Sequence, residues 1–282
     1  VRLANLRAGE LDMLERLAAT DMTSAEGDDS LVVEKATSLG YQGMTINVGN
    51  GERAENPLGQ SNLVRQALSL SIDRAALNQV VFEGAFAPGN QPYSPTSPWY
   101  NADFPVPERD VDAAKALLAE AGHGDGISIE VQVANNPVQT QVMQVIQAMA
   151  AEAGIEITLA AKEFATLLAD QSAGDYTASQ VGWSGRVDPD GNIHQFMTTG
   201  GGINDSKYSD PEMDRLLNEA RLSTDPAVRK ESYDAAIALQ QQDMPIVYLY
   251  HPVWIWALDD KVQGFTPYPD GMIRLHGVSF AE

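Results

Sequence analysis

The segment QVGWSGRVDPDGN, residues 180–192, gives the strongest indication of the fold and of a site. It completes an apolar run, Tyr176 to Trp183, whose alternation has the period of a β-strand. A loop follows that holds an indole, a hydroxyl, a guanidinium and two carboxylates. A strand that ends in such groups is typical of the ligand-binding edge of an open α/β sheet. Asp-Pro-Asp-Gly at 188–191 is also strong turn chemistry, so a binding loop and a plain polar turn are both open interpretations.

The residues before this segment predict a β-α-β unit. Residues 127–133 alternate with period two, Pro137 occupies the favoured first position of a helix that ends at Gly154, and residues 155–159 form the next strand. Such a unit makes its two strands parallel, with a right-handed crossover. A further helix leads into the strand that ends at Trp183. We therefore predict an α/β fold in which these strands share one sheet and helices cover its faces.

The remaining segments give a coarser pattern. Leucines at helical spacing predict a helix within residues 1–17, residues 21–30 read as a polar loop, and residues 245–257 read as one long strand. Valines at 80, 138 and 228 are expected to face the core. Capping patterns predict helices that begin after the following residues: Ser61 or Asn62, Asp73, Asp110, Asn136, Ser209 and Asp225.

Composition excludes several classes of function. The 282 residues suggest roughly two domains, and no apolar run approaches the length of a membrane span. The formal charge of −21 disfavours nucleic acid and anionic membranes as partners. There are no cysteines, so disulfides, thiolate metal sites and a cysteine nucleophile are excluded. The histidines (His123, His194, His251 and His276) lack metal-ligand spacing, and no cofactor is expected.

The first residues read as the middle of a helix rather than as a start. Val1 is not an initiator methionine, and no charged segment with an apolar core precedes it, so we expect no signal peptide in this chain. We expect a carboxyl-terminal fragment whose upstream part has been removed.

Several motifs, in this order and spacing, resemble one family. They are NLVRQALSLSIDRAAL (62–77), DVDAAKALLAEAG (110–122), the strand-helix-strand at 127–159, GWSGRVDPDGN (182–192), KYSDPEMDRLLNEA (207–220) and MPIVYLYHP (244–252). The chain resembles the peptide-type (family 5) periplasmic solute-binding proteins of ABC transporters over nearly all of its length.

The resemblance implies a division of the chain. Family members are about twice as long and bilobed. Residues 1–47 and 253–282 would be remnant strands of the first lobe, and residues 48–252 the complete second, periplasmic-binding-protein-like lobe. Residues 41–48 and 245–251 would be the paired hinge crossings. Strands built to pair with absent partners would expose apolar groups such as Val253, Ile255 and Phe265.

The resemblance also implies where a ligand binds. In the family the loop after Gly-Trp lines the cleft, and peptide-binding relatives carry an Asp three residues after the Trp, paired with the ligand's ammonium. Arg186 stands there instead and favours a carboxylate or phosphate. Asp188 is expected to orient it. The candidate ligand-binding residues are Trp183, Ser184, Gly185, Arg186, Asp188, Asn135 and Asn136.

The resulting hypothesis is a binding module rather than an enzyme. It would be the periplasmic solute-binding component of an ABC importer, taking a small peptide-like or anionic polar solute between two lobes and delivering it to the permease subunits. Two alternatives stay open. One is a hydrolase that uses Asp188 and Asp190. The other is a non-transport sensor with the same fold.

Overall fold

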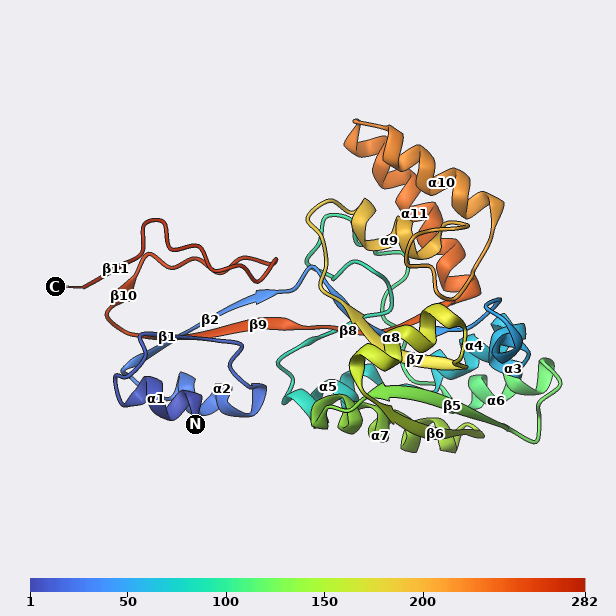
Figure 1. The fold of residues 1–282 in the computed structure, drawn as a ribbon, viewed down its shortest axis with the longest axis horizontal. Helices are drawn as coiled ribbons and strands as arrows, with labels where there is room; N and C mark the ends of the chain where they lie inside the picture. Colours follow the sequence, from blue (N-terminus) through green and yellow to red (C-terminus); the bar gives the residue numbers. More distant parts are fainter. Residues whose placement is uncertain (282) are drawn as a thin grey trace.

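The computed structural model describes residues 1–281, arranged as a larger α/β body and a smaller part joined by extended strands (Figure 1). The strands are β1 (Met13–Glu15), β2 (Leu31–Thr37), β3 (Tyr41–Ile46), β4 (Ala87–Pro88), β5 (Ile127–Ala134), β6 (Ile155–Lys162), β7 (Ala178–Trp183), β8 (Ile246–His251), β9 (Val253–Asp259), β10 (Val262–Gln263) and β11 (Ser279–Phe280). The helices are α1 (Arg2–Arg7), α2 (Ala19–Glu26), α3 (Pro57–Gln60), α4 (Asn62–Leu70), α5 (Arg74–Phe82), α6 (Val111–Glu120), α7 (Pro137–Glu152), α8 (Phe164–Ala173), α9 (Asp190–Met197), α10 (Pro211–Leu222) and α11 (Pro226–Asp243), with a 3-10 turn at Glu52–Ala54.

The larger body is built on a six-stranded mixed sheet in the order β4-β8-β3-β7-β5-β6. Strand β5 pairs in parallel with β6, with Ile127 opposite Ile155, and in parallel with β7 on its other side. Strand β3 is antiparallel to both β7 and β8. The predicted α/β fold, with the strands around residues 127–133 and 155–159 parallel in one sheet with the strand ending at Trp183, is therefore confirmed.

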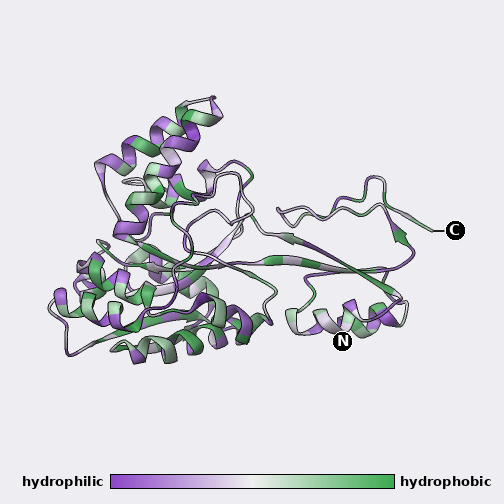
Figure 2. Ribbon diagram, turned by 180° about the vertical axis from the view of Figure 1, so that it is seen from behind, coloured by the Kyte–Doolittle hydropathy of each residue, from purple (hydrophilic) through white to green (hydrophobic). Residues whose placement is uncertain are grey.

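Two hydrophobic clusters hold helices against this sheet. On one face Met44 and Ile46 of β3 pack with residues of α4, α5, α6 and α7. On the other face Tyr41 and Tyr248 pack with residues of α9, α10 and α11. Hydrophilic and hydrophobic residues alternate along α10 and α11, as expected for helices that bury one side (Figure 2). Helices thus cover both faces, which leaves an edge of the sheet for a site.

The smaller part is an antiparallel sheet in the order β1-β9-β2, with Leu14 opposite Ala257. The helix predicted within residues 1–17 is wrong beyond Arg7, because the chain turns at Gly9, where φ is +72°. The loop predicted at residues 21–30 is also wrong, since α2 covers most of it. That helix has no side-chain cap and buries only Ala25, so its sequence carries little periodic signal.

The expectation that Val253, Ile255 and Phe265 are exposed is wrong. Ile255 is 1% exposed and packs with Leu3, Leu6, Leu14 and Leu17. Val253 and Phe265 are half-buried, not exposed. In contrast, the valines at 80, 138 and 228, which were expected to face the core, are exposed.

Two chain crossings join the parts, one at residues 38–40 and one at Pro252. The Ser38 N–H donates to the Pro252 carbonyl at 2.8 Å, and His251 Nδ1 lies 2.7 Å from the Gly40 carbonyl oxygen. Pro252 divides the run predicted as one strand into β8 and β9, so that prediction is corrected. β3 lies in the larger sheet. The assignment of residues 1–47 with 253–282, and of residues 48–252, to two lobes stays a prediction.

Most predicted helix starts are confirmed by hydrogen bonds from backbone N–H groups to the capping side chain. Asp73, Asp110, Asn136 and Asp225 all cap in this way. Asp210 caps α10 in place of the predicted Ser209, and the Ser61 side chain makes no capping bond. Among residues 1–281, no helix combines the length and the hydropathy needed to cross a bilayer.

Candidate ligand-binding site

At one end of the large sheet, the ends of its central strands lie side by side. Because β5, β6 and β7 are parallel, their carboxyl ends lie together. Because β3 is antiparallel to β7, Tyr41 at the start of β3 lies opposite Trp183 at the end of β7. The crossings to the smaller part leave from the same end (Figure 1). This end therefore faces the smaller part across a cleft.

The cleft has a volume of about 490 Å³ and is lined mainly by polar side chains. Amide groups predominate, and they come from separate elements: Asn135, Asn136, Gln139, Gln42 and Gln180. Such groups offer both donors and acceptors to a polar ligand. Of the residues predicted from sequence, Asn135, Asn136, Trp183 and Ser184 line this cleft together.

Two glutamines form the floor of the cleft. Gln180, which is 2% exposed, donates from Nε2 to Gln42 Oε1 at 2.9 Å. The Gln42 amide occupies the space that a side chain at Gly182 would need. A glycine at this position of β7 thus allows the Gln42 amide to lie against the strand.

Asn135 and Asn136 hold the turn between β5 and α7. The Asn136 side-chain oxygen accepts from the N–H groups of Val138 and Gln139 at 2.9 and 3.3 Å, so it caps the helix. The Asn135 N–H donates to the Lys162 carbonyl at 2.7 Å. Both side chains are exposed at the cleft. Their turn role is established, and their ligand role stays a prediction.

Arg186 stacks on Trp183 at the border of the cleft. Its Cζ lies 4.2 Å from the indole centroid, and Nη1 donates to the Gly185 carbonyl at 2.7 Å and to Ser184 Oγ at 3.2 Å. In residues 1–281 no carboxylate lies within 4 Å of its guanidinium. Arg186 is exposed and stacked, so its cationic group is accessible to an anion.

Buried Asn192 fixes this loop and was missed by the sequence argument. Its Oδ1 accepts from Trp183 Nε1 at 3.0 Å and from the Arg186 N–H at 2.7 Å, and its Nδ2 donates to the Arg186 carbonyl at 2.8 Å. A lone Asn in a Gly-Asn turn gives no local indication of these partners. It positions the indole and the arginine together.

Asp188 does not orient Arg186, so that expectation is wrong. Its carboxylate pairs with Arg229 of α11 at 2.6 Å, while Asp190 pairs with Arg221 of α10 at 2.7 Å. The hydrogen bond from Arg229 holds the pKa of Asp188 below its usual value. The cleft lining does not include Gly185, Arg186 or Asp188, and their contact with a ligand stays a prediction.

The smaller part contributes two cleft residues that the sequence argument missed. Arg16 and Trp254 both line it, with Arg16 Cζ 5.1 Å from the Trp254 ring centroid. Glu163 of the larger body also faces the cleft. Arg16 follows β1 and Trp254 lies in β9, so only the pairing of the two chain ends brings them here. Across residues 1–281, no group of three or more His, Asp or Glu side chains is arranged to hold a metal ion.

Comparison with known proteins places the chain among solute-binding proteins. Residues 1–205 match the sequence model described as "Bacterial extracellular solute-binding proteins, family 5 Middle". The chain is 29% identical to heme-binding protein A of Haemophilus influenzae, over 99% of this chain and 51% of that protein. It is 30% identical to di/tripeptide-binding protein 4 of Pseudomonas aeruginosa, over 95% of this chain and 51% of that protein.

A solved structure shows the same fold. HbpA2 from Haemophilus parasuis superimposes with a TM-score of 0.87 at 28% identity, covering 100% of this chain and 56% of that one. The chain spans about half the length of the curated relatives it matches.

Proposed function

Because the chain belongs to the bacterial extracellular solute-binding proteins of family 5, we propose that it supplies the ligand-binding part of an ABC importer's solute receptor. The solute is a small peptide-like or anionic polar molecule, held in the cleft at the edge of the large sheet. The two relatives are named a heme-binding protein and a di/tripeptide-binding protein. We propose a solute-binding function of this kind for the whole protein to which this chain belongs.

The observation that carries the proposal is the combination of amides that line the cleft with two exposed guanidinium groups: that of Arg16, which lines the cleft, and that of Arg186, which stacks on Trp183 beside it. The amides of Gln42, Gln180 and Asn135 suit the main chain of a peptide-like solute. Arg186, stacked on Trp183, suits a carboxylate through a planar two-point contact. Because the protein has a net charge of −21, the guanidinium of Arg186 provides a local positive charge that attracts an anion.

The proposed mechanism is closure of two lobes about the paired crossings. By the predicted division, residues 1–47 with 253–282 form one lobe and residues 48–252 the other, but β3 belongs to the large sheet and would move with the second lobe. Ligand contacts made from both sides, by Arg16 and Trp254 on one and by Gln180 and Trp183 on the other, would favour the closed state. Within residues 1–281 the backbone links between the two parts are residues 38–40 and Pro252, and these would bend on closure.

We also propose the location and partners. A family described as extracellular fits a receptor that works outside the cytoplasmic membrane, in the periplasm, and delivers its solute to permease subunits. Binding without catalysis is favoured because Asp188 and Asp190 are each paired with an arginine. The lowered pKa of Asp188 makes this carboxyl a poor general acid, so the hydrolase alternative gains no support here.

The test is native mass spectrometry of the complete gene product purified from its own host, followed by titration calorimetry with the identified solute. A co-purified peptide-like or carboxylate-bearing molecule that rebinds with micromolar or tighter affinity supports the proposal. A purely cationic solute, or turnover of the solute during the titration, contradicts it.

A further inference from the structure

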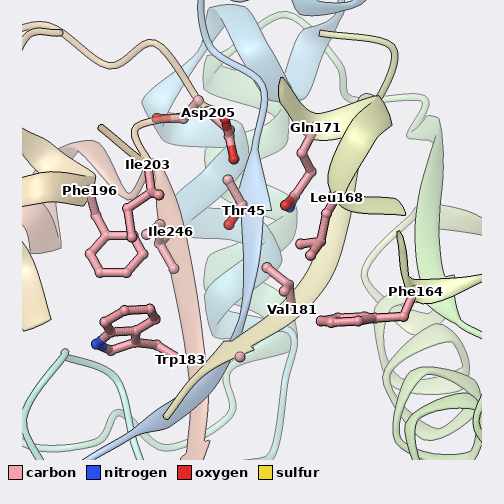
Figure 3. Close-up of a pocket in the computed structure, with 12 residues that line it drawn as sticks. Thr45, Phe164, Leu168, Gln171, Val181, Trp183, Phe196, Ile203, Asp205 and Ile246 are labelled. Atoms are coloured by element: carbon pink, nitrogen blue, oxygen red, sulfur yellow. The ribbon is translucent and has the colours of Figure 1, made fainter. Parts of the chain in front are cut away.

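A second hollow of about 290 Å³ opens on the face of the large sheet, between α8 and the segment after α9 (Figure 3). We call it the side groove. Thr45 of β3 and Val181 of β7 form its floor. Gln42 and Gln180, which form the floor of the cleft, do not line the side groove.

The walls of the side groove are apolar side chains that solvent can reach. Phe164 and Leu168 project from α8 on one side and are 53% and 38% exposed. Phe196 and Ile203 stand on the opposite side, and Trp183 closes one end (Figure 3). When an apolar group displaces water from between these walls, apolar surface is buried on both sides, and this burial favours binding.

One buried polar group in the side groove lacks a partner. Gln171 of α8 is 2% exposed, and within residues 1–281 its Nε2 has no hydrogen-bond acceptor. Its amide end points into the groove toward Leu168 (Figure 3). A buried donor without an acceptor is costly and rare, which indicates an acceptor supplied by a ligand.

The side groove is continuous with the cleft. Phe164, Val181, Gly182 and Trp183 line both. The carboxylate of Asp205 stands at the far end of the groove and disfavours an anionic group there (Figure 3). A solute that spans both spaces therefore has its anionic end in the cleft, which Arg16 lines and beside which Arg186 stacks on Trp183.

We propose that the solute places an apolar group carrying a hydrogen-bond acceptor in the side groove, packed on Phe164 and Leu168 and accepting from Gln171. This inference rests on the proposed function, which it narrows. The solute class becomes peptide-like molecules with one sizeable, largely apolar side chain. Short solutes with only polar or methyl side chains would leave the groove unfilled.

The experiment is titration calorimetry of the complete gene product with the dipeptides Ala-Ala, Ala-Leu and Leu-Ala. In the wild type the better of the two leucine peptides is expected to bind about tenfold more tightly than Ala-Ala, since each buried methylene strengthens binding. Leu168→Trp fills the groove from an exposed helix position. It should remove this preference and leave the affinity for Ala-Ala within about twofold. Val80→Trp, at an exposed position of α5 outside the groove, is the matched control. It should change neither the preference for leucine nor the affinity for Ala-Ala.

A second variant tests the unpartnered donor. Gln171→Leu should lower the affinity for Ala-Gln relative to Ala-Leu by about fivefold, the effect of one net hydrogen bond. If this buried substitution impairs folding, the Leu168→Trp comparison still decides the proposal.

The outcomes separate the two proposals. If all dipeptides bind but without a preference for leucine, or if Leu168→Trp keeps the preference, the side-groove inference is wrong while the proposed function stands. If no dipeptide binds the wild type, the peptide-like class fails, and the inference fails with it.

Discussion

Gly185 and Gly40 lie backbone against backbone, where the loop after β7 meets the first crossing. A Cβ on Gly185 would lie 2.5 Å from the Gly40 nitrogen, and one on Gly40 would overlap the Trp183 carbonyl. Gly185 also has a φ of +85°. The candidate ligand-binding loop and the crossing between the two parts are therefore in direct contact, so a change in one is transmitted to the other.

Gly185→Ala is expected to destabilise the protein and to weaken ligand binding. Left-handed backbone strain costs about 1–2 kcal/mol, and the overlap with Leu39 and Gly40 adds about 1–3 kcal/mol. Gly200→Ala is the matched control, because Gly200 also has positive φ but has open space around it. Urea denaturation of both variants measures the difference. Equal losses of stability would mean that the contact between loop and crossing contributes nothing.

Gly182→Ala tests the two glutamines at the floor of the cleft. The added methyl meets the far end of the Gln42 side chain, and displacing this amide leaves the buried Gln180 donor without its acceptor, so stability should fall by about 1–3 kcal/mol. The Gln42 amide must move, and its bond to Gln180 is lost, so affinity for the solute should fall by about 1 kcal/mol or more. Thermal unfolding and calorimetric titration of the same samples check this. A loss of stability with unchanged affinity would contradict it.

Arg186→Ala should leave stability within about 0.5 kcal/mol, because Arg186 is exposed and has no carboxylate partner among the described residues. Affinity for a carboxylate-bearing solute should fall by roughly 2–5 kcal/mol if the closed cleft desolvates the pair. Arg186→Lys should restore only part, since the two-point geometry is lost. Lys115→Ala removes one charge from α6, away from the cleft, and controls for net charge. Unchanged affinity without Arg186 would exclude an anionic contact there.

The buried imidazole of His251 is expected to make the stability of the protein depend on pH. Burial lowers its pKa from 6.5 to about 4, and its Nε2 has no partner in residues 1–281. Between these two values the unfolded chain binds the proton and the folded chain does not. Stability therefore falls as pH drops from 6.5 to 4, by on the order of 3 kcal/mol for this group. His251→Asn keeps a donor for the Gly40 carbonyl and should flatten this decline. Urea denaturation at several pH values in that window measures it, and parallel curves for the two proteins would contradict it.

The sequence predicted those elements whose stabilising contacts are local. The β5-α7-β6 unit follows from period-two strands, the Asn136 cap and Pro137, all close in the chain. Strand β1 and helix α2 were missed because β9, from the other end of the chain, completes their core. Helix α9 was missed because the turn residues around Pro189 dominate the local pattern.

The candidate site shows the same limit. Trp183, Ser184, Asn135 and Asn136 were predicted because parallel strands end together, and the structure brings them to one cleft. The prediction that Asp188 contacts Arg186 was wrong. Its partner, Arg229, lies 41 residues further along the chain and reaches the loop through the packing of α11. Arg16 and Trp254 carry no sequence signal for the cleft, since a strand pairing between the chain ends places them there.

The pairing of β9 between β1 and β2 dictates the order in which this chain acquires its structure. As the polypeptide leaves the ribosome, β1 and β2 emerge long before β9, the central strand that joins them. Strand β8, which links β3 to β4, comes immediately before it. Closing contacts of such long sequence separation is slow. The sheet β1-β9-β2 therefore cannot form until β9 has been synthesised, and during that interval β1 and β2 are unpaired and available to chaperones.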